Sequence, residues 1–440
     1  MPVRVRMKSK ALLVLLGSAS AACDSTVNLD YQPRYFDELL ASGICRAPDS
    51  VDDSQLDLSL QILSYTREGT VSLLPNDAVV IDGIPRQVEE ELRSDDFEFA
   101  LAANCKTDEV DPATFNSCAE RSDQPSSQTG LSLLGSSLRY EVPGGDARRG
   151  DDRLVVLLLD NSGSLKGQPD PTQSVDPSKA SDQRDERLTF FKNLVRLPYI
   201  PLDTYFSLVW FDQRQPHITQ EFATPTRNRD VMVCPAGSDG ATCRLDKAFD
   251  GLSQLERGEI GSTPLADALD QTYNIVINGK DTKAFNPVVI LFTDGTERGD
   301  SSGSGKTLAQ VTQTYANHTY GGQASPVPVI VLHLQPRLAS GFAQGRDPEL
   351  YALACATGGE YVFIERSDEF TTSNTLEPLV ANRIAGAWKL RVSSTDTVGL
   401  GSGQYLLSSE LSLTLGGKKE STALTSSDDE TEDTRLWFVK

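Results

Sequence analysis

The chain has 440 residues and a formal net charge of −21, from 41 Lys and Arg against 62 Asp and Glu. This length allows about two or three domains, and the 38% hydrophobic content is that of a folded soluble protein. The acidic balance argues against nucleic-acid binding, which needs clustered basic residues, and the three scattered histidines form no HExxH motif or Cys/His finger.

The N-terminus has the pattern of an export signal. Basic residues between positions 4 and 10 precede a short apolar run at 11–16, and small residues lead to Cys23. The segment resembles a bacterial lipoprotein signal. That resemblance implies a signal peptide at 1–22, lipidation of Cys23 and a membrane-anchored lipoprotein of the bacterial cell envelope, facing the periplasm or the cell surface. An ordinary secretory signal cleaved near Ala22 is the alternative.

Six further cysteines form an even set, which in an exported protein indicates disulfide bonds. Cys355 lies in an apolar, helical stretch, where it is either a free buried thiol or the partner of Cys45. The preferred bridges are the two pairs close in sequence, Cys105–Cys118 and Cys234–Cys243.

The segment at 23–148 has β character. Apolar and polar residues alternate at 56–62, 97–99 and 138–142, which is typical of half-buried strands. The segment at 373–440 has similar alternation at 388–392 and 411–415. Neither segment offers many convincing strands alone, so we expect the two to combine into one discontinuous β-sandwich.

Between these segments, at 149–372, strands alternate with helices. The run LVVLLL at 154–159 is continuously apolar, as expected of a strand buried on both faces of a parallel sheet. The alternation predicts an α/β domain with a doubly wound, mostly parallel sheet. Strands are expected at 205–211, 287–292, 327–334 and 361–364, and helices at 186–197, 263–277, 307–315 and 349–356.

Three loops of this domain carry oxygen-bearing side chains at the ends of predicted elements. Asp160, Ser162 and Ser164 follow the first buried strand, Thr263 lies at the start of the helix expected at 263–277, and Asp294 follows the strand at 287–292. Ligands of doubly wound sheets bind at the carboxyl ends of the strands. A turn or helix cap formed by Asp160 and its serines is the alternative for the first loop alone.

Together the three loops resemble the von Willebrand factor A (VWA, or integrin I-like) family over roughly residues 152–370. That family has a metal-ion-dependent adhesion site (MIDAS) built from Asp-x-Ser-x-Ser, a Thr and an Asp. The resemblance implies a VWA fold, a bound Mg²⁺ (or Mn²⁺ or Ca²⁺) and a partner protein that presents Asp or Glu to the ion. The implied metal ligands are Asp160, Ser162, Ser164, Thr263 and Asp294.

The residue types suit that chemistry. A hard divalent cation takes about six oxygen ligands, some of them water. Two carboxylates among neutral hydroxyls leave such an ion electrophilic enough to accept a further carboxylate from a partner.

We therefore expect a metal-dependent protein-binding or adhesion module at the cell envelope, which is not an enzyme and touches the membrane only through its lipid anchor. One alternative is a structural or assembly scaffold lipoprotein in which the ion stabilises the fold. Another is a serine hydrolase that uses Ser301, since Gly299–Gly303 fits GxSxG.

Overall fold

The computed structural model describes much of the central region and the strands and helices on either side. The described residues in the middle of the chain are 152–167, 174, 176–195, 204–211, 226–227, 249, 252, 263–279, 285–295, 305–335, 346–372 and 376–385. Outside this region the structure describes the flanking strands, whose bounds are given below. The predicted signal peptide at 1–22 lies outside the described residues, as do Cys23, Cys118, Cys234, Cys243, Ser301 and the side chain of Cys105.

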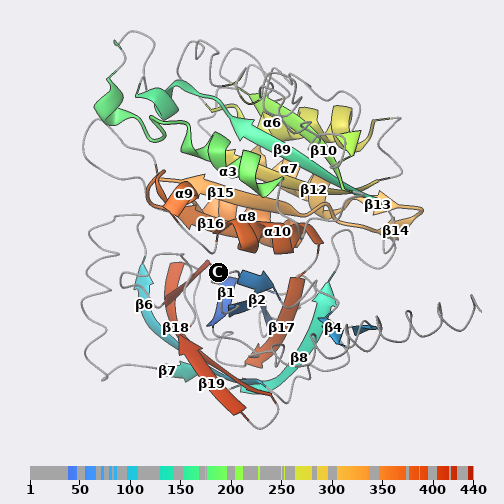
Figure 1. The fold of residues 1–440 in the computed structure, drawn as a ribbon, viewed down its shortest axis with the longest axis vertical. Coiled ribbons are helices and arrows are strands. Elements are labelled where there is room, and N and C mark those ends of the chain that lie inside the picture. The colour runs from blue at the N-terminus through green and yellow to red at the C-terminus, as the bar shows by residue number, and fades with distance from the viewer. Residues whose placement is uncertain are drawn as a thin grey trace, which may run out of the picture.

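A six-stranded sheet, the central sheet, comes from the middle of the chain and lies in the upper half of Figure 1. All neighbouring strands are parallel except the two-residue edge strand, which confirms the prediction of a mostly parallel α/β sheet. In spatial order the strands are β11 (Thr226–Arg227), β10 (Tyr205–Phe211), β9 (Arg153–Asp160), β12 (Asn286–Thr293), β15 (Val329–Leu334) and β16 (Glu360–Ile364).

Helices cover both faces of this sheet. On one face lie α3 (Glu186–Leu194), α9 (Glu369–Thr372) and α10 (Leu376–Ala385), and on the other α6 (Leu265–Thr272), α7 (Leu308–Ala316) and α8 (Pro348–Thr357). Each face has its own hydrophobic core, because alternate side chains of β9 point to opposite sides. Within the described residues, no helix has the length and apolarity needed to cross a bilayer.

The helix ends follow from local sequence. Thr307 forms a capping box at the start of α7, and the Asp347 side chain accepts the first free N–H groups of α8.

The helix expected at 263–277 divides into α6 and a π-helical turn, η9 (Tyr273–Ile277). The remaining short elements are η6 (Gly163–Lys166), η7 (Pro177–Lys179), β4 (Val79–Ile81) with β5 (Ile84–Arg86), and β13 (Thr319–Tyr320) with β14 (Gln323–Ala324).

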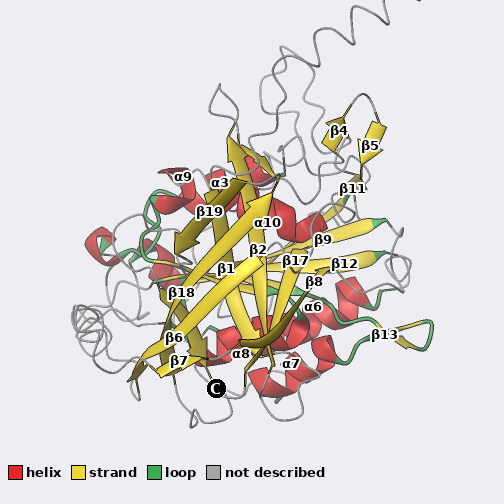
Figure 2. Cartoon of the chain, turned by 90° about the horizontal axis from the view of Figure 1, so that it is seen from below, coloured by secondary structure: helices red, strands yellow, loops and turns green. Residues whose placement is uncertain are grey.

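Two further five-stranded sheets contain strands from both ends of the chain (Figures 1 and 2). One holds β1 (Glu38–Arg46), β2 (Gln55–Tyr65), β17 (Ala387–Ser394), β8 (Leu133–Glu141) and β3 (Val71–Leu73). The other holds β19 (Lys418–Ala423), β18 (Gln404–Leu415), β6 (Phe97–Thr107), β7 (Thr129–Leu131) and β20 (Arg435–Val439). The antiparallel pairs β2–β17 and β6–β18 join the two ends, and β1 lies against β19 and β20.

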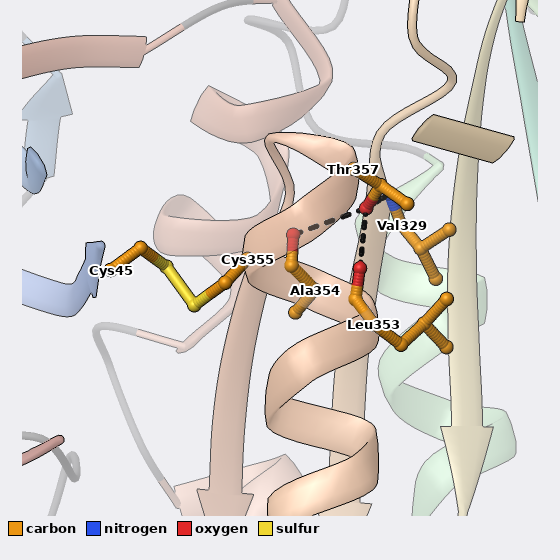
Figure 3. The surroundings of a disulfide bond; sticks show 6 residues. All are labelled: Cys45, Val329, Leu353, Ala354, Cys355 and Thr357. Carbon is orange, nitrogen blue, oxygen red and sulfur yellow. Dashed lines mark hydrogen bonds between the residues drawn. A yellow bond between two sulfur atoms is a disulfide. The ribbon is translucent and has the colours of Figure 1, made fainter. Parts of the chain in front are cut away.

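The central sheet meets the flanking sheets through its β16 edge. There β16 lies against β1, α8 against β20 and α10 against β3. A disulfide bond between Cys45 of β1 and Cys355 of α8 fastens the same contact (Figure 3). The Thr357 hydroxyl donates to the carbonyl oxygens of α8 and accepts the Val329 N–H at 3.1 Å, which ties the end of this helix to β15. Of the two alternatives for Cys355, the structure shows pairing with Cys45.

Removal of this bridge should destabilise the protein, because it joins cysteines 310 residues apart. Closing so long a loop in the unfolded chain is worth up to about 5 kcal/mol in the chain-entropy description. The Cys45→Ala/Cys355→Ala double variant should unfold at a lower temperature than the native protein in scanning calorimetry. Peptide mapping without reduction should recover the two peptides joined, and a free Cys355 thiol would contradict the pairing.

Candidate metal centre

The carboxyl ends of β9 and β12 form a topological switch point. Numbered along the chain, the five parallel strands have the spatial order 2-1-3-4-5. The chain leaves β9 towards α3 on one face and leaves β12 towards α7 on the other, so the loops at these carboxyl ends diverge and leave room for a ligand. Asp160 is the last residue of β9, and Asp294 directly follows β12. Both acidic residues therefore lie where this topology favours binding.

Hydrogen bonds hold both oxygens of the Asp160 carboxylate. Oδ1 accepts the backbone N–H of Ser162 at 2.7 Å, and Oδ2 accepts the Thr293 hydroxyl at 2.7 Å. Asp160 is completely buried. Because Thr293 is the last residue of β12, its hydroxyl links the ends of the two neighbouring strands and fixes the carboxylate across them.

The two serines of the first loop lie against Asp294. Their hydroxyl oxygens are 2.9 Å apart, and the Ser164 hydroxyl donates to Asp294 Oδ1 at 2.8 Å. The Ser162 hydroxyl is 3.5 Å from the same oxygen. Both serines are partly exposed, whereas Asp294 is buried. The structure thus brings the first and third predicted loops together at the level of side-chain contacts.

Thr263 reaches the same place through a glycine. A Cβ on Gly295 would lie 2.5 Å from Thr263 Oγ1, so the absence of a side chain at Gly295 allows the threonine to lie directly beside this glycine, the residue after Asp294. Thr263 is itself buried at the start of α6. All five predicted residues are therefore grouped at one edge of the sheet. Thr263 belongs to the group through its packing against Gly295.

The electrostatics of the two carboxylates are unfavourable. Burial, together with repulsion from Asp160, raises the pKa of Asp294 to about 7. Burial also raises the pKa of Asp160, although the hydrogen bonds from Thr293 and Ser162 and the charge of Arg187 oppose that shift. Two carboxylates in a low-dielectric site are difficult to ionise together.

This donor set fits a small, hard divalent cation. It consists of two carboxylates and three hydroxyls, and oxygen is the ligand that Mg²⁺, Mn²⁺ and Ca²⁺ prefer. In the part of the chain that the structure describes, no group of three or more His, Cys, Asp or Glu side chains could hold a metal. A cation would also offset the repulsion from Asp160 that, after burial, raises the pKa of Asp294.

Three residues at this site escaped the sequence analysis. Thr293 holds Asp160, Ser181 donates its hydroxyl to Asp294 Oδ2, and the charge of the buried Arg187 opposes the rise in the pKa of both acids. Thr293 could have been found, since it directly precedes Asp294 at the end of a predicted strand. Ser181 and Arg187 have no such signal, because they lie in and after a polar loop whose path the sequence does not reveal.

Fold and site together define an α/β protein with an acidic, hydroxyl-rich site at its switch point. No protein-family model matches the chain, and no curated protein matches it. Among solved structures, a point mutant of the PilB minor pilin from Streptococcus sanguinis aligns with a TM-score of 0.34 and 11% identity, covering 84% of this chain and 98% of that one. The PilB minor pilin itself aligns with a TM-score of 0.33 and 12% identity, covering 86% and 99%. TM-scores this low establish neither a shared fold nor a shared function.

The raised pKa of Asp294 predicts a pH dependence of stability without metal. The unfolded carboxyl ionises near its ordinary pKa of 3.8 and the folded one at about 7, so its contribution to stability is full below pH 3.8 and is lost as the pH rises through 7. In EDTA, the native protein should therefore lose unfolding free energy between pH 5 and pH 8 relative to Asp294→Asn. Urea unfolding at the two pH values measures this, and parallel behaviour of the two proteins would contradict it.

Proposed function

We propose that this protein binds a divalent cation with a VWA-type site and uses it to hold an acidic residue of a partner protein. The observation that carries the proposal is the contact of Asp294 with Ser162 and Ser164 beside the buried Asp160, at the switch point of a parallel sheet. Three loops far apart in sequence contribute oxygens to one place, which a helix cap within the first loop does not explain.

The residues would have distinct tasks. Asp160 and Asp294 supply the negative charge, and the hydroxyls of Ser162, Ser164 and Thr263 supply neutral oxygens. A bound Mg²⁺ would supply a Lewis-acidic centre to which a partner carboxylate can bind. The partly exposed serines face the approach side, because they are the members of the set that retain solvent contact.

The proposal includes export and lipid anchoring at Cys23. The disulfide between Cys45 and Cys355 supports an oxidising compartment, because such bonds persist outside the cytosol. The N-terminal pattern of basic, apolar and small residues before Cys23 supports the same compartment. The protein would then present its site at the envelope, tethered to the membrane by lipid.

A scaffold role, in which the ion only stabilises the fold, is the second candidate. It is favoured by the burial of both carboxylates, since Asp160 is 0% and Asp294 1% exposed. A cation held by such residues is well shielded and would stabilise the folded state by mass action. The two functions share the metal site and differ in whether the ion retains a position for an outside ligand.

The metal site itself is tested by Asp160→Asn, which keeps the shape of the side chain and removes its charge. Loss of a residue that only supports a metal ligand typically lowers metal affinity about 10- to 100-fold. Because Asp160 would itself be a ligand, we expect the affinity for Mg²⁺ and Mn²⁺ to fall at least about 100-fold. Asp176→Asn is the matched control, because Asp176 is a partly exposed acid of the neighbouring loop, and its substitution should leave affinity unchanged. Isothermal titration calorimetry gives both values, and equal affinities in the two variants would refute the site.

Partner binding separates the two candidate functions. Immobilised native protein should retain envelope proteins in Mg²⁺ and release them in EDTA, and immobilised Asp160→Asn protein should not retain them. If the ion only stabilises the fold, melting would depend on metal while no retention would be sensitive to EDTA.

A further inference from the structure

The loop between η6 and α3 folds back onto the residues that carry Ser162 and Ser164. The N–H of Ser181 donates to the carbonyl oxygen of Ser164 at 3.3 Å, and the N–H of Asp182 to that of Leu165 at 3.1 Å. A left-handed Gly167 starts the fold-back with φ of 81°, and a Cβ there would lie 1.9 Å from the Asp176 carbonyl oxygen. Only glycine permits this approach, so the return of the loop is built into the sequence at that point.

The fold-back places Ser181 against the second oxygen of Asp294. The Ser181 hydroxyl is buried and donates to Asp294 Oδ2, while Ser164 donates to Oδ1. The Ser181 oxygen also lies 3.3 Å from the Ser164 carbonyl oxygen, but a hydroxyl has one proton and the carboxylate is the stronger acceptor. Asp294 is thus held from both sides, with Oδ1 turned towards the two serines of the first loop.

A buried ion-pair network fastens the segment that carries Ser181. Arg187 Nη1 donates to Asp182 at 2.6 Å and to Asp185 at 2.8 Å, and Lys166 donates to Asp185 at 2.6 Å. Arg187 is only 1% exposed. Two acids and two bases make the network electrically neutral, which reduces the cost of burying it.

The same arginine touches both strand ends of the candidate metal centre. Its Nη2 donates to the side-chain oxygen of Asn161, next to Asp160, at 3.3 Å, and its guanidinium carbon lies 5.7 Å from the centre of the Phe292 ring near the end of β12. The network therefore fixes the loop directly to the elements that carry the two carboxylates.

We propose that Ser181 is a sixth functional residue of the metal centre, a positioning residue that orients Asp294 so that Oδ1 faces the cation. The Arg187 network holds Ser181 in that position. This inference rests on the proposed metal binding. It extends the site to a loop that lies outside the VWA-type motif of Asp160, Ser162, Ser164, Thr263 and Asp294. Groups that orient metal ligands typically change metal affinity about 10- to 100-fold when they are removed.

The test is Mn²⁺ affinity, measured by calorimetry and by electron paramagnetic resonance of free Mn²⁺. Ser181→Ala should bind Mn²⁺ about tenfold more weakly or worse, and Ser181→Thr, which keeps the hydroxyl, should recover most of the affinity. Ser178→Ala is the matched control, because Ser178 lies in the same loop but bonds to the exposed Asp176. If Ser181 had only a structural role, Ser181→Ala would lower the melting temperature of the protein in EDTA. Its Mn²⁺ affinity would then not depend on whether residue 181 carries a hydroxyl.

Lys166→Met provides a second variant in case Ser181→Ala does not fold, since Lys166 is partly exposed and lies at the edge of the network. It should weaken Mn²⁺ binding about threefold by loosening the loop, and should add nothing in a Ser181→Ala background. Unchanged or tighter binding by Ser181→Ala, or by Lys166→Met alone, would overturn the role of Ser181. If Asp160→Asn still abolishes binding in that case, the metal centre stands and only this inference fails; if Asp160→Asn also binds normally, the proposed function fails.

Discussion

Two carboxylates buried at the ends of adjacent parallel strands are the constraint around which this site is arranged. Burial raises the pKa of Asp294, and repulsion from Asp160, which water screens little there, raises it further. The protein surrounds them with donated hydrogen bonds from Thr293, Ser164 and Ser181. Those bonds orient the acids but bring no full positive charge. A small cation among these oxygens would supply the missing charge, which is why we propose metal binding for the site.

The rest of the architecture keeps this edge in place. Strand β12 lies in the middle of the central sheet, whereas the flanking sheets attach through β16, two strands away. The Cys45–Cys355 bond reinforces that attachment. The contact that joins the two parts of the molecule is therefore on a different edge of the sheet from the carboxyl ends that carry the candidate site.

Sequence patterns were a good guide to the central region. The apolar run of β9 and the alternation of strands with helices predicted the parallel sheet. A strand that is buried on both faces is continuously apolar and does not alternate between apolar and polar residues. Patterns were a poor guide in the flanks. Strand β19, with the sequence KKESTA, has no apolar alternation, and β1 is interrupted by small residues. Their strand conformation depends on pairing with β18 and β2, which lie elsewhere in the chain.

In the α/β region, the sequence alone determined the strands and the chemistry at their ends, because these depend on neighbours within a few residues: Asp160 ends β9, and Asp294 directly follows β12. Tertiary structure decided which of those ends meet. Ser181 contacts Asp294 across 113 residues, and Cys45 joins Cys355 across 310. No local spacing encodes such contacts, because they depend on the path of a polar loop and on the packing of one sheet against another.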